Sequence, residues 1–181
     1  MVRHDGRVTP DSPAPSAFAV CFVCTGNICR SPMAEVVLRE VARRAGHADS
    51  LDVSSSGTGD WHVGEGADPR TVEALRARGY DGSRHRASQF STADFARHDL
   101  VVALDRGHER VLRSWAEDES DRSKVQLLMS FDPQGAARSG SDVPDPYYSD
   151  PAMFDDVLAM VERACTALFR QIEPALRKGP S

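Results

Sequence analysis

One short segment of the sequence, residues 23–32 (VCTGNICRSP), combines residue types that could bind a phosphate group and attack it. Cys24 and Arg30 are separated by five residues. A cysteine thiolate is a strong nucleophile, and the planar guanidinium of arginine can contact two phosphate oxygens at once. Gly26 and Asn27 tolerate the left-handed backbone conformation that a tight loop requires. This pattern predicts a phosphate-binding turn in which Cys24 is the nucleophile and Arg30 holds the phosphate.

The backbone of this turn should contribute to binding as well. A tight turn between a strand and a helix leaves several N–H groups without partners, and the positive end of the helix adds attraction for an anion. The same positive electrostatic field favours the thiolate form of Cys24 over the thiol form. The Cys-x5-Arg spacing alone is a weak signal, but the glycine, asparagine, serine and proline around it all fit the same turn.

The flanking sequence predicts the strand and the helix that hold this turn. Residues 18–23 are a continuous apolar run, which is typical of a buried strand. Ser31 is suited to cap a helix and Pro32 to occupy its first position, and apolar residues then recur at helical spacing up to Ala42. We therefore expect the turn to join the first strand to the first helix.

Further strands are predicted at residues 51–54, 100–104 and 125–129, with helices beginning at Asp68-Pro69 and at Asp105. The last helix has an apolar stripe from Phe154 to Ile172, which includes Cys165 as a small buried residue. This alternation predicts a single α/β domain, a four-stranded parallel sheet with helices on both faces. Ligands of such sheets bind at the carboxyl ends of the strands, where the predicted turn lies.

The composition excludes some classes of function. The chain has 181 residues, of which 40% are hydrophobic, and a net charge of −5, which fits one ordinary domain without the basic field of a nucleic-acid-binding protein. No run reaches about 18 apolar residues, so we expect no membrane partner.

Residues 1–17 are polar, contain three prolines and lack a signal-peptide core. We interpret them as a disordered leader on a cytoplasmic protein whose folded domain spans residues 18–178.

The cysteine pattern favours neither disulfides nor a metal site. Three of the four cysteines crowd the first strand and its turn, which is unlike a disulfide framework. Cys21 and Cys24 have the spacing of zinc ligands, but strand alternation would direct them to opposite faces, and no matching Cys/His pair follows. The sequence therefore predicts no metal and no cofactor.

The segment CTGNICRSP at residues 24–32 resembles the signature of the low-molecular-weight protein tyrosine phosphatases, and the likeness extends from Phe18 to the last helix. The loop GTGDWH at residues 57–62 is similar to that of bacterial members. The resemblance implies that Cys24 attacks the phosphorus to form a phosphocysteine and that Arg30 stabilises the transferring group. It implies that the phosphate is bound by Thr25, Gly26, Asn27, Ile28, Cys29 and Ser31, with the Ser31 hydroxyl also bonded to the Cys24 sulfur.

The resemblance also implies a supporting hydrogen-bond network of Asn27, Ser55 and His85 behind the turn. Two nearby positions depart from the family pattern. Ser56 stands where alanine is common, and Ser88 replaces a common arginine.

The general acid and the substrate slot are expected in the last loop. Asp145 lies in VPDPYY, residues 143–148, which is similar to the family's acid loop, and it would protonate the departing tyrosine oxygen. Tyr147 and Tyr148 would face Trp61 across a deep slot that stacks on a phenyl ring. Because a shorter phosphoserine could not reach Cys24 in such a slot, the expected partners are phosphotyrosine proteins, and the enzyme is expected to be a monomer or a weak dimer.

Three other functions are consistent with parts of this pattern. Protein-arginine phosphatases share the fold and the turn, although Ile28 and the paired tyrosines favour phosphotyrosine. An arsenate reductase needs a cysteine pair after the nucleophile, and this function is excluded because the sequence has none between Cys29 and Cys165. A redox-sensing phosphate-binding protein could use a transient disulfide between Cys24 and Cys29.

Overall fold

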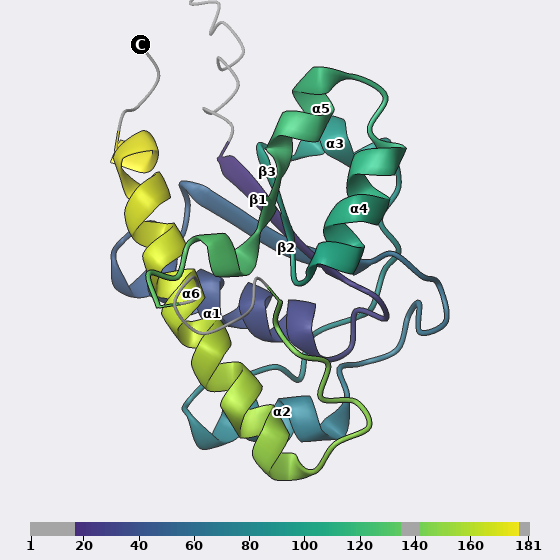
Figure 1. The fold of residues 1–181 in the computed structure, drawn as a ribbon. Helices are drawn as coiled ribbons and strands as arrows, with labels where there is room; N and C mark the ends of the chain where they lie inside the picture. The colour runs from purple at the N-terminus through teal and green to yellow at the C-terminus, as the bar shows by residue number, and fades with distance from the viewer. Residues whose placement is uncertain (1–16, 135–141, 178–181) are drawn as a thin grey trace, which may run out of the picture.

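The computed structural model describes residues 17–134 and 142–177. The leader predicted for residues 1–17 thus lies, apart from Ala17, outside the described residues. Four parallel strands form the centre of the fold (Figure 1). They are β1 (Phe18–Cys24), β2 (Leu51–Gly57), β3 (Leu100–Ala103) and β4 (Val125–Leu127), and their order across the sheet is β2-β1-β3-β4. The predicted fold class is confirmed.

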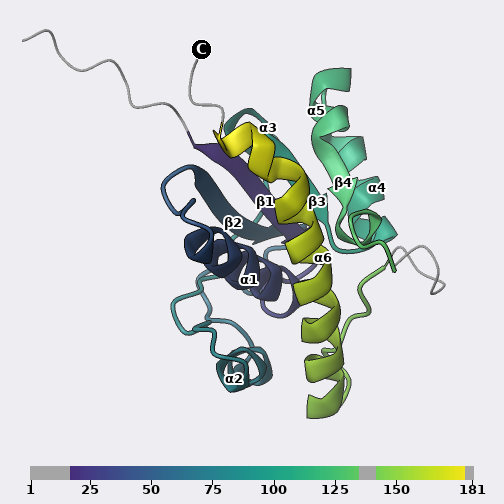
Figure 2. The same ribbon diagram turned by 90° about the vertical axis from the view of Figure 1, so that its left-hand side faces the viewer.

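Helices cover both faces of this sheet, as Figure 2 shows from the side. One face packs against α1 (Arg30–Arg44) and α6 (Pro151–Arg177), and α2 (Pro69–Ala77) packs in turn against these two helices. The other face packs against α3 (Asp94–Arg97), α4 (Arg106–Trp115) and α5 (Glu119–Lys124). Because parallel strands must be joined by crossover connections, the chain passes over one face or the other between strands, and this produces the two helical layers.

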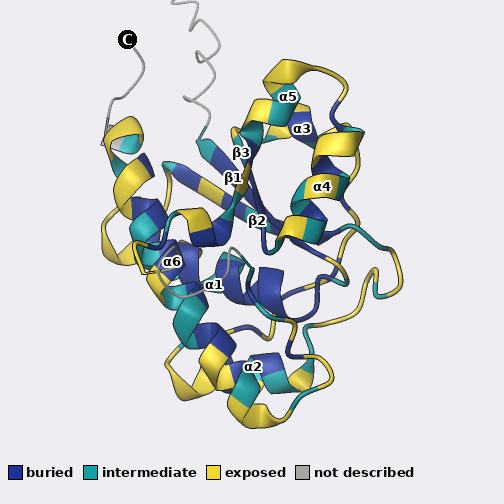
Figure 3. Ribbon diagram, in the orientation of Figure 1, coloured by how far each residue is buried: buried dark blue, intermediate teal, exposed yellow. Residues whose placement is uncertain are grey.

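The two faces of β1 belong to two separate hydrophobic clusters. Phe22 and Cys24 pack in the cluster with α1 and α6, whereas Cys21 and Val23 pack in the cluster with α4. Alternation along the strand therefore directs Cys21 and Cys24 to opposite faces, as predicted. In Figure 3 the strands are mostly buried and the outer surfaces of the helices are exposed. The apolar stripe of α6, including Cys165, is buried as predicted.

Several element boundaries differ from the prediction. β2 extends to Gly57, because its polar residues 54–57 still pair in register with residues 21–24 of β1. The last strand is shorter than predicted and continues as a 3-10 helix, η1 (Leu128–Ser130). Helices α3 and α5 were not predicted, since the first has only four residues and the second buries none.

The predicted start of α1 was wrong. The helix begins at Arg30, and its N-cap is Cys29, which makes no side-chain capping bond. Ser31 lies inside the helix, and its hydroxyl contacts the Cys24 sulfur and does not cap a backbone N–H. In the part of the chain that the structure describes, no helix has both the length and the apolar surface needed to cross a bilayer.

Candidate active site

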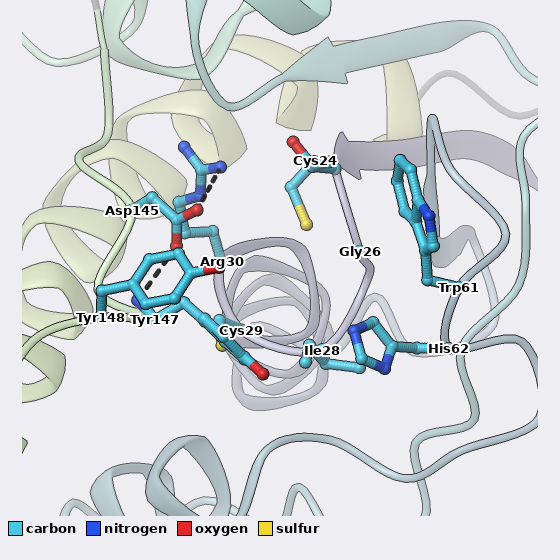
Figure 4. A pocket seen from close by; sticks show the side chains of 11 residues that line it. Cys24, Gly26, Ile28, Cys29, Arg30, Trp61, His62, Asp145, Tyr147 and Tyr148 are labelled. Atoms are coloured by element: carbon cyan, nitrogen blue, oxygen red, sulfur yellow. Dashed lines mark hydrogen bonds and ion pairs between the residues drawn. The ribbon is translucent and has the colours of Figure 1, made fainter.

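A pocket of about 320 Å³ opens at the carboxyl end of β1. It is formed by the loop between β1 and α1, the loop after β2 and the loop before α6. Figure 4 shows the Cys24 sulfur pointing into this space, with Arg30 on one side and Trp61 on the other. The residues that line the pocket are Cys24, Thr25, Gly26, Ile28, Cys29, Arg30, Trp61, His62, Asp145, Tyr147 and Tyr148.

The backbone of residues 24–30, named the phosphate loop below, holds its carbonyl groups outward. Four of these carbonyls accept hydrogen bonds from neighbouring segments. The pairs are Thr58 N to Cys24 O (2.8 Å), Gly59 N to Thr25 O (3.0 Å), His85 Nε2 to Asn27 O (2.7 Å) and Asp68 N to Ile28 O (2.9 Å). By contrast, the N–H groups of residues 26–29 donate to no other described residue. A loop whose N–H groups are unpaired while its carbonyls are occupied is suited to bind an anion.

Gly57 lets the loop pack this closely against β2. A Cβ atom at this position would lie 2.6 Å from the carbonyl oxygen of Thr25, a distance that real side chains do not adopt. The residue is therefore restricted to glycine by the backbone of the phosphate loop.

Asn27 is the internal brace of the phosphate loop. It is fully buried and has a φ of 58°, in the left-handed region that asparagine tolerates. Its Nδ2 donates to Ser31 Oγ at 2.8 Å and to Ser55 Oγ at 2.9 Å, and its Oδ1 accepts from the Ser88 backbone N at 3.0 Å. Since the Ser88 contact uses the backbone, the serine found in place of a family arginine does not remove it.

A partly buried carboxylate completes the network behind the loop. Glu35 Oε2 accepts a hydrogen bond from Ser55 Oγ at 2.7 Å and lies 3.3 Å from His85 Nδ1. Burial raises the pKa of Glu35, but the hydrogen bonds from His85 and Ser55 and the charge of Arg39 outweigh it and leave the pKa below its ordinary value. The structure thus brings Ser55 and His85 together with Asn27, and it adds Glu35, which was not predicted.

The Cys24 sulfur contacts the hydroxyl group of Ser31. Its Sγ lies 2.9 Å from Ser31 Oγ, and the residue is buried. Cys29 is a free thiol that lines the same pocket, and burial raises its pKa to about 12. Cys29 is therefore protonated at neutral pH.

Arg30 is held by three oxygen atoms of later segments. Its Nη1 donates to Asp105 Oδ2 at 2.8 Å and to the Val143 carbonyl at 2.9 Å, and its Nη2 lies 3.6 Å from Asp145 Oδ2. Burial raises the pKa of Asp105, but the backbone N–H of His108 and the charges of His108 and Arg30 lower it below its ordinary value. An ionised Asp105 fixes the guanidinium in the pocket wall.

The side chain of Thr25 is held by a histidine that the sequence did not reveal as a site residue. Thr25 Oγ1 and His108 Nε2 are 2.8 Å apart. Burial lowers the pKa of His108 to about 4, against the opposing charge of Asp105, so the imidazole is neutral at pH 7. Its Nδ1 lies 3.1 Å from Asp105 Oδ1 but outside hydrogen-bond geometry.

Asp145 stands at the mouth of the pocket, beside the aromatic side chains. Its side chain is half exposed, and its Oδ1 accepts a hydrogen bond from the Tyr147 backbone N at 3.1 Å. The rings of Tyr147 and Tyr148 meet edge to face, with their centroids 4.9 Å apart. Figure 4 shows Trp61 on the opposite wall, where it is 69% exposed. Aromatic surface on two walls suits the binding of a phenyl ring.

All of the predicted site residues lie in this pocket or directly behind it. Four further residues that contribute were not predicted: Glu35, His62, Asp105 and His108. Asp105 could have been found, since it follows β3 at the same sheet edge as Cys24. Glu35 follows Ser31 by one helical turn, which is a weaker signal. His62 lies in the GTGDWH loop that resembles bacterial members of the family, but it was not predicted to line the pocket, and no sequence signal marks His108.

The comparisons with known proteins agree with this geometry. The sequence profile of the family described as low molecular weight phosphotyrosine protein phosphatase matches residues 19–178. A relative named low molecular weight protein-tyrosine-phosphatase, from Streptomyces coelicolor, is 53% identical over 155 residues, which are 86% of this chain and 93% of the relative. The low molecular weight protein-tyrosine phosphatase A of Mycobacterium tuberculosis is 47% identical over 163 residues, with coverage of 90% and 96%.

Solved structures give the same result. A protein tyrosine phosphatase from Entamoeba histolytica superposes with a TM-score of 0.82 at 30% identity, covering 88% of this chain and 99% of the other. YfkJ from Bacillus subtilis has a TM-score of 0.81 at 34% identity, covering 88% and 97%. These comparisons do not favour the alternatives of a protein-arginine phosphatase or a redox sensor. The chain belongs to the low molecular weight phosphotyrosine protein phosphatase family.

Proposed function

We propose that this protein-tyrosine phosphatase hydrolyses phosphotyrosine in proteins by two successive displacements on the sulfur of Cys24. The observation that carries the proposal is the arrangement at the bottom of the pocket. The Cys24 sulfur, the Arg30 guanidinium and a set of unpaired backbone N–H groups share one small space. Such a set of positive groups binds a phosphate dianion and stabilises the charge of the transferring phosphoryl group.

In the first step, the Cys24 thiolate attacks the phosphorus while the bond to the tyrosine oxygen breaks. A phenolate is a poor leaving group because phenol has a pKa of about 10. Asp145 gives its proton to the departing oxygen, so that tyrosine leaves as the neutral phenol. The position of Asp145 at the pocket mouth, with Oδ2 3.6 Å from Arg30 Nη2, supports this role.

In the second step, water hydrolyses the phosphocysteine. Asp145, now a carboxylate, takes a proton from the water as its oxygen attacks the phosphorus, and the sulfur leaves as a thiolate. The Ser31 hydroxyl, 2.9 Å from the sulfur, stabilises the thiolate as it forms. The enzyme returns to its starting state with one inorganic phosphate released.

The substrate class follows from the walls of the pocket. Trp61, Tyr147 and Tyr148 would hold a phenyl ring between them, and the phosphorus would then reach the buried sulfur. We propose phosphotyrosine proteins as the partners. Comparing kcat/KM on phosphotyrosine, phosphoserine and phosphoarginine peptides tests this choice, and a preference for either of the last two would contradict it.

We further propose that residues 18–178 form the catalytic domain, that the enzyme acts in the cytoplasm, and that it is a monomer or a weak dimer. The elements from Phe18 to Arg177 and the profile match support the domain limits. The free cysteines are compatible with a reducing compartment. Light scattering across a range of protein concentrations tests the oligomeric state.

The mechanism is tested with an aryl phosphate and three variants. Cys24→Ser and Arg30→Lys should abolish measurable turnover, because one lacks the nucleophile and the other the two-pronged contact. Asp145→Ala should lower kcat/KM by about 10²–10⁴ for a phenolic leaving group. Robust turnover by Cys24→Ser would overturn the assignment of the nucleophile, and a wild-type rate for Asp145→Ala would overturn that of the acid.

A further inference from the structure

Arg70, the second residue of α2, makes contacts that the mechanism above does not use. Its Nε and Nη2 donate to the two carboxylate oxygens of Asp68, at 3.0 and 2.9 Å, and Asp68 Oδ1 also accepts from the Arg70 backbone N at 2.9 Å. These hydrogen bonds lower the pKa of Asp68 below its ordinary value, so the pair is ionised at neutral pH. The two side chains therefore form a rigid, bidentate unit at the start of α2.

The remaining surface of the guanidinium faces the acid loop, residues 143–149. Arg70 Nη1 donates to the Ser149 carbonyl at 3.2 Å. The Arg70 Cζ lies 5.5 Å from the centre of the Tyr147 ring and 4.5 Å from that of Phe154 in α6. The guanidinium thus contacts the acid loop at two residues. It donates a hydrogen bond to Ser149 and lies against the aromatic ring of Tyr147.

The other end of the unit reaches the phosphate loop. The Asp68 backbone N donates to the Ile28 carbonyl at 2.9 Å, one of the bonds that hold the loop carbonyls outward. On the acid loop, the Tyr147 backbone N donates to Asp145 Oδ1 at 3.1 Å. A continuous chain of contacts therefore runs from the phosphate loop through Asp68 and Arg70 to the carboxyl group of Asp145.

We propose that Arg70 is a positioning residue that ties the acid loop to the phosphate loop and so sets the place of Asp145 relative to the departing oxygen. Asp145 needs such a tie because its own carboxylate is half exposed and only 3.6 Å, not hydrogen-bonded, from Arg30. Lysine could not replace Arg70, since a single ammonium cannot pair with Asp68 through two nitrogens, reach Ser149 and stack on Tyr147 at once. This inference rests on the proposed function.

The test compares Arg70→Met and Arg70→Lys with a matched control, Arg76→Met. Arg76 lies on the same helix, pairs only with Glu73 among the described residues, and does not contact the acid loop. The quantity measured is kcat/KM for two aryl phosphates, because it reports only the steps up to departure of the leaving group. One substrate releases a phenol with a pKa near 10, and the other releases a nitrophenol acidic enough to leave without a proton.

Loss of positioning should affect only the substrate that needs the proton. For the two Arg70 variants we expect kcat/KM to fall about 10-fold or more with the phenol and less than about 3-fold with the acidic nitrophenol. Inhibition by inorganic phosphate should change less than about 2-fold, because the phosphate loop keeps its own hydrogen bonds. Arg76→Met should match the wild type in all three measurements, and urea titration verifies that each variant is folded.

A double variant separates this inference from the proposed function. In the Asp145→Ala background, Arg70→Met should cause no further loss with the phenol, because the acid that it positions is absent. An equal loss with both substrates, or a loss that adds fully to that of Asp145→Ala, would overturn the role of Arg70. Failure of the proposed function would appear differently, as an Asp145→Ala variant whose kcat/KM falls equally, or not at all, for the two substrates.

Discussion

Replacing Asn27 tests the brace of the phosphate loop most sharply, because two different substitutions separate its two contributions. Alanine removes the three side-chain hydrogen bonds to Ser31, Ser55 and Ser88 and keeps a Cβ atom at a φ of 58°. Glycine removes the same hydrogen bonds but adopts this backbone conformation freely. The difference between the two variants therefore reports the backbone alone.

The magnitude follows from the contacts. Three buried hydrogen bonds at about 1 kcal/mol each give a loss of about 3 kcal/mol in the free energy of unfolding. The left-handed backbone adds about 1 kcal/mol for alanine. We expect a loss of about 4 kcal/mol for Asn27→Ala and about 3 kcal/mol for Asn27→Gly. Both losses are smaller than the roughly 5–15 kcal/mol by which a typical domain is stable, so both variants should fold.

Urea unfolding followed by far-ultraviolet circular dichroism measures these values, and inhibition by phosphate measures the state of the loop. Both variants should bind phosphate about 10-fold more weakly, because the N–H groups are no longer held in place. A loss below about 1 kcal/mol for alanine would refute the role of the hydrogen bonds. A glycine variant that is no more stable than the alanine variant would refute the contribution of the left-handed backbone.

Three further predictions concern single residues around the loop. Gly57→Ala should lower the free energy of unfolding by about 1–3 kcal/mol, because its Cβ would lie 2.6 Å from the Thr25 carbonyl; an unchanged urea midpoint would contradict the close packing. Burial lowers the pKa of His108 from 6.5 to about 4, so the unfolded chain takes up the proton first as the pH falls. Stability should then decline between about pH 6.5 and 4, by up to about 3 kcal/mol, and His108→Gln should abolish this part of the decline; equal pH slopes in the two proteins would argue against it. Because burial raises the pKa of Cys29 to about 12, iodoacetamide at pH 7.5 should alkylate Cys24 and spare Cys29 in a peptide map, and equal labelling would count against this.

The parts of the site that could be predicted from the sequence are those made by neighbouring residues. The phosphate loop is a continuous segment between a strand and a helix, so the order of residue types from Cys24 to Pro32 reveals its chemistry. The buried strands and the stripe of α6 follow from local periodicity. Asp145 has no such local signal, and only the resemblance of its loop to a known family identified it.

The contacts that neither the local pattern nor the family resemblance predicted join residues far apart in the chain. Arg30 meets Asp105 across 75 positions, and Thr25 meets His108 across 83. No periodicity in either segment reports such a pairing, because it arises from the order of the strands in the sheet. For Ser31 the local pattern predicted a helix cap, whereas the family resemblance implied the contact with the Cys24 sulfur that the structure has.

The central claim, that Cys24 carries the phosphoryl group between the two steps, is tested most directly by trapping the intermediate. Enzyme mixed with a ³²P-labelled aryl phosphate is quenched within milliseconds, digested and mapped by mass spectrometry. The account predicts a phosphorylated peptide that contains Cys24, with at most one phosphate per chain and none in Cys24→Ser. Label on any other side chain, or steady turnover without bound phosphate at any time, would contradict it.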